Sequence, residues 1–272
     1  MNSRVLKLPS MGVLLVSTDL HGNHEDFARM RELFLAEHDA HWVQLGDLVH
    51  APSEDARRHT PELYDFPDGS IDIVLGFAAL QREHSGRVHV VLGNHDHAHV
   101  GGPHTRKFHA DEVEHLESTM TPAELEVLRT LFSNASLAAV APCGALLCHG
   151  SPDDSLTDLR ALDDVPLDIS RGTDAQRALL RTLLTSYGQP GEVTARVLAA
   201  VSEPGTPLTF LIHGHDRDPS GWFTEGGNQA EPVIFGALRE NKRYLRLSLS
   251  ARYPGVDALR DGEEIRRLYP AG

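Results

Sequence analysis

The sequence predicts an α/β fold with a polar site at one edge of its strands. Short apolar runs recur along the chain, amphipathic stretches lie between them, and a polar cluster follows each run where it stops. The apolar runs cover residues 13–16, 42–45, 88–92, 145–148 and 210–212. Ligands in α/β folds gather where strand ends release their loops, so five polar clusters at five strand ends predict one shared site.

The segments between these runs carry helix signals. Residues 25–35 have apolar side chains at helical spacing, and Glu25 and Asp26 would face the partial positive charge of the helix N-terminus. Thr121 followed by Pro122 is typical of a helix cap and first helical position. We also expect helices over 174–185 and 192–201, a loop over the Pro-, Asp- and Arg-rich residues 52–70, and a last strand over 244–249.

The polar clusters contain the types of side chain expected to bind two adjacent metal ions. In chain order they are Asp19-Leu20-His21, Gly46-Asp47, Gly93-Asn94-His95-Asp96, His149-Gly150 and Gly214-His215. A carboxylate can bridge two cations, while neutral imidazole and amide oxygen complete the shells without adding much charge. Mixed oxygen and nitrogen ligands suit Mn, Fe or Zn better than Ca. Two metals roughly 3.5–4 Å apart can hold a phosphate oxygen and a hydroxide for in-line attack.

The order of these segments resembles the calcineurin-like metallophosphoesterases, and within them the phosphoprotein phosphatase (Ser/Thr phosphatase-like) branch. Asp19-Leu20-His21-Gly22 resembles the branch's Asp-x-His-Gly, and Cys148-His149-Gly150 resembles its Cys-His-Gly-Gly. Residues 131–140 resemble the stretch before the fourth motif. The resemblance implies a four-layer α/β sandwich of two mixed sheets with flanking helices, and a dinuclear metal site at the strand ends.

The resemblance also implies a role for each residue. The first metal is bound by Asp19 and His21, both metals by the bridging Asp47, and the second metal by Asn94, His149 and His215. The catalytic histidine is His95, and Asp96 is the nearest residue to orient its imidazole. Asp216 and Arg217 follow His215, so the second histidine of broader metallophosphoesterases is missing. The first metal should then have three protein ligands, with His213 a neighbour and not a ligand.

Two departures concern the phosphate contacts. The branch's second motif, Gly-Asp-x-Val-Asp-Arg-Gly, has an Asp that orients the acid histidine and an Arg that holds phosphate. Here His50 and Ala51 stand at those positions, and the third motif ends in Asp96 instead of Glu. The second motif also resembles the Gly-Asp-Leu-Val of symmetric dinucleoside tetraphosphatases. A replacement guanidinium for bidentate phosphate contact is expected from one of Arg57, Arg58, Arg106 and Arg171.

The remaining histidines are expected to have no catalytic role. His97 and His99 follow the third motif closely enough to line the pocket. The others read as surface, loop or packing residues, although His50 closely follows Asp47; they include His24, His38, His41, His50 and His59.

The length and net charge of the chain indicate how many domains it has and which partners it can bind. One metal centre assembled from positions 19–215 favours a single domain over residues 1–272, with 153–206 as a helical lid or substrate wall. The net charge is −14, from 39 acids against 25 bases, so nucleic acid is not an expected partner. We read the acidic run 112–117 as a solvated face.

Further features concern the compartment. No run of about 18 apolar residues predicts a transmembrane helix, and the start of the chain lacks an apolar secretory core. The two cysteines, Cys143 and Cys148, fit neither a redox pair nor a zinc ribbon, so packing in a reducing cytoplasm is expected.

The sequence therefore favours a metal-dependent phosphatase. The expected reaction is hydrolysis of a phosphomonoester, foremost on protein Ser or Thr, by a hydroxide that bridges two divalent ions, with Mn favoured over Fe or Zn. The alternatives are a dinucleoside polyphosphatase or a small-molecule phosphomonoesterase. A non-catalytic phosphate-binding module is less favoured, because the metal set and His95 are both present.

Overall fold

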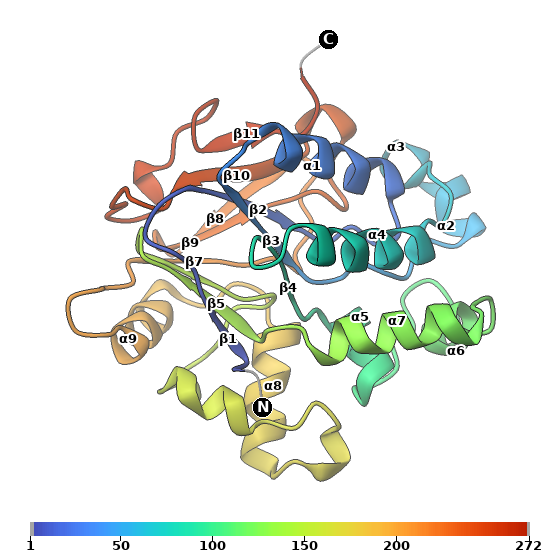
Figure 1. Cartoon of the computed structure of the whole chain (residues 1–272), viewed down its shortest axis with the longest axis horizontal. Coiled ribbons are helices and arrows are strands. Elements are labelled where there is room, and N and C mark those ends of the chain that lie inside the picture. Colours follow the sequence, from blue (N-terminus) through green and yellow to red (C-terminus); the bar gives the residue numbers. More distant parts are fainter. Residues whose placement is uncertain (1–2, 271–272) are drawn as a thin grey trace.

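Two mixed sheets pack face to face with helices outside both, as the sequence predicts. The structure is a computed structural model and describes residues 3–270. Helices α1 and α4 lie over the outer side of one sheet, while α9 contacts the other (Figure 1). The four-layer α/β sandwich is therefore confirmed.

The smaller sheet has five strands in the order β11-β10-β2-β3-β4. Its strands are β2 (Val13–Thr18), β3 (Ala40–Leu45), β4 (Val88–Val91), β10 (Arg243–Ser248) and β11 (Ile265–Arg267). The neighbours β2, β3 and β4 run parallel, so the loops that follow them emerge at the same edge. Two of those loops carry the first and second motifs, and the third motif follows β4.

The larger sheet has six strands in the order β1-β5-β6-β7-β9-β8. Its strands are β1 (Val5–Lys7), β5 (Ala138–Ala141), β6 (Ala145–Leu147), β7 (Phe210–Ile212), β8 (Trp222–Glu225) and β9 (Gln229–Pro232). The parallel pair β6 and β7 brings the fourth and fifth motifs side by side, because each motif directly follows its strand.

Nine α-helices connect these strands within residues 3–270. They are α1 (His24–Ala36), α2 (Glu54–His59), α3 (Pro61–Tyr64), α4 (Ser70–Glu83), α5 (Asn94–His97), α6 (Glu112–Glu117), α7 (Pro122–Ser133), α8 (Asp174–Thr185) and α9 (Gly191–Val201). The four predicted helices are confirmed. None of the helices in this part of the chain is long and apolar enough to cross a membrane.

The predicted loop over residues 52–70 is wrong in part, because it contains α2 and α3. The Ser53 side chain accepts a hydrogen bond from Ala56 N and caps α2, and Pro61 begins α3. Both helices are too short for apolar periodicity to reveal them. The longer α4 was not predicted, and Gly69 before it offers no side-chain cap.

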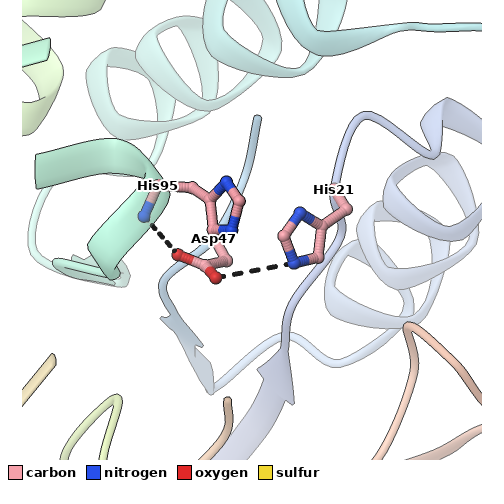
Figure 2. A group of neighbouring side chains, drawn as sticks. All are labelled: His21, Asp47 and His95. Atoms are coloured by element: carbon pink, nitrogen blue, oxygen red, sulfur yellow. Dashed lines mark hydrogen bonds and ion pairs between the residues drawn. The ribbon is translucent and has the colours of Figure 1, made fainter. Parts of the chain in front are cut away.

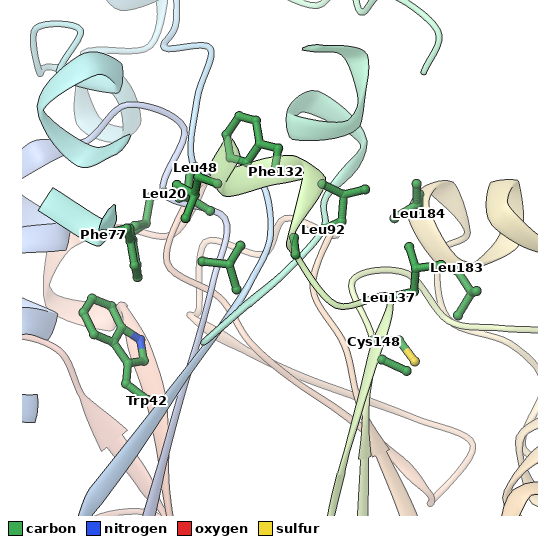
Figure 3. Close-up of a cluster of buried hydrophobic side chains, with 14 of the residues drawn as sticks. Leu20, Trp42, Leu48, Phe77, Leu92, Phe132, Leu137, Cys148, Leu183 and Leu184 are labelled. Carbon is green, nitrogen blue, oxygen red and sulfur yellow. The ribbon is translucent and has the colours of Figure 1, made fainter. Parts of the chain in front are cut away.

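Strand side chains alternate between two apolar layers. Leu14 and Val16 of β2 lie between the sheets, whereas Leu15 belongs to the layer under the helices. In that outer layer Trp42 packs against Phe77 at a ring-centroid distance of 4.7 Å (Figure 3). Burying a large apolar side chain contributes about 1.5–3 kcal/mol, so these two layers fix the strand ends that carry the polar clusters.

Candidate metal centre

The predicted ligands lie on tight turns after the strands. Asp19, His21, Asp47 and His215 have φ angles of 34°, 42°, 51° and 77°, which side-chain-bearing residues rarely adopt. Each such residue costs on the order of 1–3 kcal/mol, and strain of this kind clusters at functional sites. Hydrogen bonds connect the turn after β2 to the turn after β3, since the amides of Leu20 and His21 both donate to Asp47 O at 2.9 Å.

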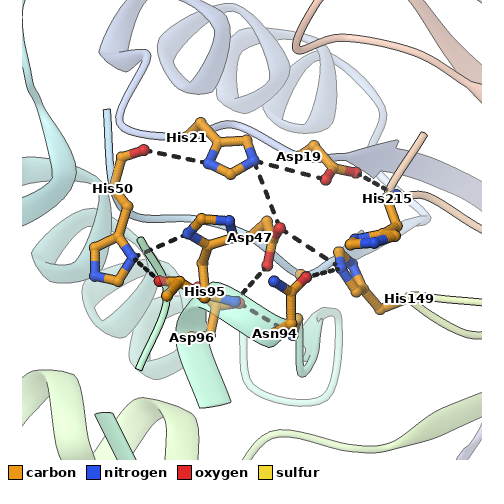
Figure 4. Close-up of polar contacts among 12 residues, drawn as sticks. Asp19, His21, Asp47, His50, Asn94, His95, Asp96, His149 and His215 are labelled. Carbon is orange, nitrogen blue, oxygen red and sulfur yellow. Dashed lines mark hydrogen bonds and ion pairs between the residues drawn. The ribbon is translucent and has the colours of Figure 1, made fainter. Parts of the chain in front are cut away.

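Asp47 lies at the centre of the cluster. Its Oδ2 is 3.5 Å from His21 Nε2 and 3.6 Å from His149 Nε2 (Figure 4). Its Oδ1 accepts a hydrogen bond from the main-chain N of His95 at 2.9 Å (Figure 2). One carboxylate oxygen between imidazoles from different sheets has the geometry expected of a bridging ligand.

A second group of ligand atoms converges on the side chain of Asn94. Its terminal amide atom facing this group is 3.1 Å from His149 Nε2, 3.3 Å from Asp47 Oδ2 and 3.0 Å from His215 Nδ1. His149 Nδ1 donates to Leu45 O at 2.7 Å, which leaves the lone pair on Nε2. With the amide oxygen turned inward, four lone-pair atoms face one point, and a cation suits that arrangement.

Asp19 completes the other side of the cluster. Its Oδ1 is 3.9 Å from His21 Nε2, and its Oδ2 accepts from the main-chain N of His215 at 3.0 Å. His21 Nδ1 donates to His50 O at 3.2 Å, so Nε2 is again the ligand atom. Nitrogen and oxygen donors in this mixture suit Mn, Fe or Zn.

Two groups of possible ligand atoms occur at this centre, and within each group the atoms lie within 4.8 Å of one another. One contains His21, Asp47 and His95, and the other contains Asp47, His149 and His215. Both share Asp47, as a dinuclear arrangement requires. The first group contains His95 and not Asp19, so the expected acid lies beside His21 and Asp47, two of the predicted ligands.

The charges of the two buried carboxylates depend on their neighbours. Burial acts to raise the pKa of Asp47, but His149, His95 and His21 outweigh it and hold the pKa below its ordinary value. Burial raises the pKa of Asp19 to about 6, with the Asp47 charge adding to the effect. With Asp47 ionised, ionisation of Asp19 is therefore unfavourable unless a cation binds beside the two carboxylates.

His95 is surrounded by groups that the sequence did not connect to it. Its Nδ1 lies 3.2 Å from Glu112 Oε2 and 3.0 Å from His50 Nδ1. Asp96, expected to orient this imidazole, instead accepts from Leu48 N at 2.9 Å and from Gly93 N at 3.2 Å. Asp96 therefore ties the second motif to the third, and no hydrogen bond or ion pair joins its carboxylate to the His95 ring within residues 3–270.

The acidic run 112–117 is not wholly a solvated face. Glu112 is completely buried, although Glu114 on the same helix is exposed. Burial acts to raise the pKa of Glu112, but the neighbouring His95 brings it down to about 2. His50, expected to have no role, is also buried, and burial together with His95 and His99 lowers its pKa to about 2.

None of the four predicted arginines bonds to the predicted ligands within residues 3–270. Arg57 donates to Phe66 O at 3.1 Å, and Arg58 pairs on the surface with acids of its own helix. Neither these two nor Arg106 or Arg171 makes a hydrogen bond or ion pair with a predicted ligand in the described part of the chain.

A lysine that the sequence did not single out lies nearer. Lys107 Nζ is 4.9 Å from the Phe235 ring centre, and that ring is 4.1 Å from His21. Its charge is close enough to lower the pKa of Asp19, which burial raises. Lys107 is therefore the cation placed to meet an anionic group at the metal centre. It carries no motif, and only the folding of the 101–111 loop places it.

A pocket of about 270 Å³ opens beside Asn94. Its lining includes Leu180 and Leu184 of α8 together with Pro103 and Ile169. His97 also lines it, with Nε2 donating to Leu167 O at 2.6 Å. His99 does not line this pocket and instead contacts His50.

His213 lies beside the centre in a group of its own, as expected of a neighbour. Its Nδ1 donates to Gly214 O at 3.0 Å and is 3.5 Å from Glu231 Oε2. Glu231 Oε1 accepts from Asp216 N at 2.9 Å and so supports the turn that carries His215.

Two mixed sheets with a His- and Asp-rich cluster at their strand ends define a metallophosphoesterase fold. The family model described as calcineurin-like phosphoesterase matches residues 12–223, and the chain belongs to this family of phosphoester hydrolases. The resemblance drawn from the motifs and the expected enzyme class are therefore confirmed. No curated protein matches the sequence.

Solved structures share the fold at low identity. A protein serine/threonine phosphatase from Saccharomyces cerevisiae aligns with a TM-score of 0.61 and 15% identity, covering 90% of this chain and 76% of that one. A cold-active protein-tyrosine phosphatase from a Shewanella species aligns with a TM-score of 0.57 and 13% identity, covering 92% and 78%. At these identities the similarity shows the fold alone.

Proposed function

We propose that the chain hydrolyses phosphomonoesters at a dinuclear centre bridged by Asp47. The observation that carries the proposal is the place of Asp47 Oδ2, 3.5 Å from His21 Nε2 and 3.6 Å from His149 Nε2. The proposed ligands are those implied by the motifs: Asp19, His21 and Asp47 for one ion, and Asp47, Asn94, His149 and His215 for the other. Manganese is favoured, with iron or zinc as alternatives.

Lys107 and His95 have different roles in the proposed reaction. When bound, the two cations would polarise the phosphoryl group and activate water. Lys107 attracts the anionic substrate and takes the place of the arginine missing from the second motif. His95 gives its Nε2 proton to the leaving oxygen as the phosphorus–oxygen bond breaks, because its Nδ1 is already engaged by Glu112 and His50.

The favoured substrate is a phosphorylated Ser or Thr side chain of a protein. Asp19-Leu20-His21-Gly22 and Cys148-His149-Gly150 resemble the phosphoprotein phosphatase branch in two of its motifs. An alkyl leaving group of this kind needs protonation, and the buried surroundings of His95 suit that task.

The pocket beside Asn94 favours a second candidate, a small phosphoester or a dinucleoside polyphosphate. Its volume of about 270 Å³ is just under the range of common ligand pockets and accommodates one flat ring. Arg181 lies at this pocket and makes no side-chain hydrogen bond or ion pair within residues 3–270, so it is available to a second anionic group. In this proposal α8 forms the substrate wall expected of residues 153–206.

We further propose a cytoplasmic location. Cys143 and Cys148 are both buried and unpaired, as expected where thiols stay reduced.

A metal-reconstituted substrate panel tests the proposed function. Protein stripped with chelator is supplied with Mn, Fe or Zn and assayed on p-nitrophenyl phosphate, phosphoserine and phosphotyrosine peptides, and a dinucleoside tetraphosphate. The proposal expects metal-dependent release of phosphate, fastest with phosphoserine peptides. Cleavage of the dinucleotide alone would select the second candidate, and no hydrolysis with any metal would reject the function.

A further inference from the structure

A buried carboxylate lies beside the ring of His95. Glu112 is the first residue of α6, and its side chain has no exposed surface. Its Oε2 is 3.2 Å from His95 Nδ1 and 3.7 Å from His50 Nδ1. An isolated ionised carboxylate is costly to bury, so its position requires a group that compensates the charge.

The other oxygen of this carboxylate fixes its orientation. Glu112 Oε1 accepts a hydrogen bond from Phe108 N at 2.9 Å, and Glu112 N donates to Thr105 O at 3.1 Å. Oε2 makes no hydrogen bond of good geometry within residues 3–270. One oxygen is therefore anchored to the backbone, and the free oxygen is the one nearest the His95 ring.

His50 provides a second contact to the same ring nitrogen, and its proton can be placed from the neighbouring bonds. His99 Nδ1 is 2.9 Å from Glu117 Oε1, which accepts only, so this Nδ1 carries a proton and Nε2 has the lone pair. His50 Nε2, 2.8 Å from His99 Nε2, must then be the donor. In its neutral form His50 therefore offers a lone pair on Nδ1, 3.0 Å from His95 Nδ1.

The two contacts have different consequences for His95. Both favour a proton on His95 Nδ1, since Glu112 and His50 each present an acceptor to it. Only Glu112 adds negative charge, because a neutral imidazole adds none. The position where the phosphoprotein branch has an aspartate is His50 in this chain, so the carboxylate reaches His95 from a different segment.

We propose that Glu112 is the positioning residue that orients the ring of His95 through its Nδ1–H, with His50 fixing the same tautomer. The proposal rests on the proposed function. His95 Nε2–H then passes to the leaving oxygen as the phosphorus–oxygen bond breaks, His95 remains neutral with its proton on Nδ1, and Glu112 stays ionised. Solvent returns the transferred proton to Nε2.

The test compares Glu112→Gln with a double variant that moves the carboxylate. Glu112→Gln keeps the shape and the oxygen that accepts from Phe108 N, but removes the charge. We expect kcat on phosphoserine to fall roughly 10²-fold, the lower end of a general-acid contribution, with a much smaller loss on p-nitrophenyl phosphate. KM and metal content should stay near wild type.

The double variant Glu112→Gln with His50→Asp should recover at least about tenfold of this loss, since residue 50 already reaches His95 Nδ1. Glu114→Gln removes the same charge from an exposed position of α6 and is the matched control, with no expected change. Equal losses on both substrates, or no recovery in the double variant, would overturn the proposal.

A spectroscopic readout keeps this test separate from the test of function. In zinc-loaded protein labelled with nitrogen-15 at histidine, His95 Nδ1–H should give a hydrogen-bonded imidazole resonance, assigned by its loss in His95→Ala. Glu112→Gln should shift it strongly and Glu114→Gln should not. If that resonance is missing, or unmoved by Glu112→Gln, the positioning role is wrong even where the enzyme is active. If it behaves as expected in a protein without phosphatase activity, the proposed function fails alone.

Discussion

Removing the side chain of His95 should separate its chemical role from the integrity of the metal centre. The main-chain N of His95, not its ring, donates to Asp47 Oδ1 at 2.9 Å, so His95→Ala leaves this bond to the bridging carboxylate intact. General-acid catalysis contributes about 10²–10⁴-fold. We expect kcat on phosphoserine to fall by that factor, which raises the barrier by roughly 3–5 kcal/mol.

The same variant should lose stability for a reason visible in the packing. Glu112 is fully buried and loses the imidazole 3.2 Å from its Oε2. A buried polar group left without its partner costs about 1–3 kcal/mol. At about 2–4 °C per kcal/mol for a domain somewhat smaller than this one, Tm should fall by roughly 2–12 °C.

The assay compares two leaving groups and counts metal. p-Nitrophenolate leaves with little protonation, so the loss on p-nitrophenyl phosphate should be much smaller than on phosphoserine. His59→Ala, at an exposed position of α2, serves as the control and should match wild type in rate, Tm and metal content. Equal losses on the two substrates would mean that His95 only positions phosphate, and loss of metal would make it a ligand.

Three further perturbations test other parts of the site. Lys107→Met removes the cation that packs on Phe235 beside His21, and should raise KM roughly 10-fold or more, since hydrogen bonds to charged groups contribute about 1.5–3 kcal/mol. Arg58→Met, on the surface of α2, should leave steady-state kinetics unchanged. Thr185→Trp should fill the pocket beside Asn94 and raise KM for aryl phosphates but not for phosphoserine, whereas Ala178→Trp, exposed on the same helix and outside the pocket, should have no effect. Metal binding should weaken as pH falls through about 6, because Asp19 must lose its proton to bind and burial raises its pKa to that value; calorimetric affinities that stay constant between pH 5 and 7 would contradict this.

The clustering of the proposed ligands was predictable because each of them closely follows its strand. Asp47 is two residues beyond β3, and His149 is two residues beyond β6. Parallel neighbours bring such residues to one edge, so position along the chain is enough to place them together. The left-handed backbone at Asp47 and His215 was not predictable, because nothing in the local sequence demands a positive φ of a residue other than glycine.

The partners of His95 could not be read from the sequence. Glu112 lies in an acidic run that has the composition of an exposed helix face, and its burial follows from the path of the 101–111 loop. Asp96 is adjacent to His95 in sequence, yet its carboxylate points to the amides of Leu48 and Gly93. Sequence adjacency on a helical turn does not make two side chains meet, whereas tertiary contact does.

The sequence also could not show which basic side chains lie near the metal centre. Arg57 and Arg58 follow the second motif closely along the chain, but α2 directs them to Phe66 and to surface acids. Lys107 carries no motif and lies near the centre only because its loop packs on Phe235. The motifs therefore predicted which residues gather at the strand ends, whereas the tertiary fold determines which charged side chains surround them.

The most direct test of the dinuclear centre is the metal content of Asp47→Asn. Asp47 Oδ2 is 3.5 Å from His21 Nε2 and 3.6 Å from His149 Nε2, so loss of its charge should weaken both ions together. We expect two ions per chain in active wild-type protein by inductively coupled plasma mass spectrometry, and fewer than one in Asp47→Asn after dialysis, with activity lost in parallel. One ion per chain in active wild-type protein, or full activity in Asp47→Asn, would contradict the account.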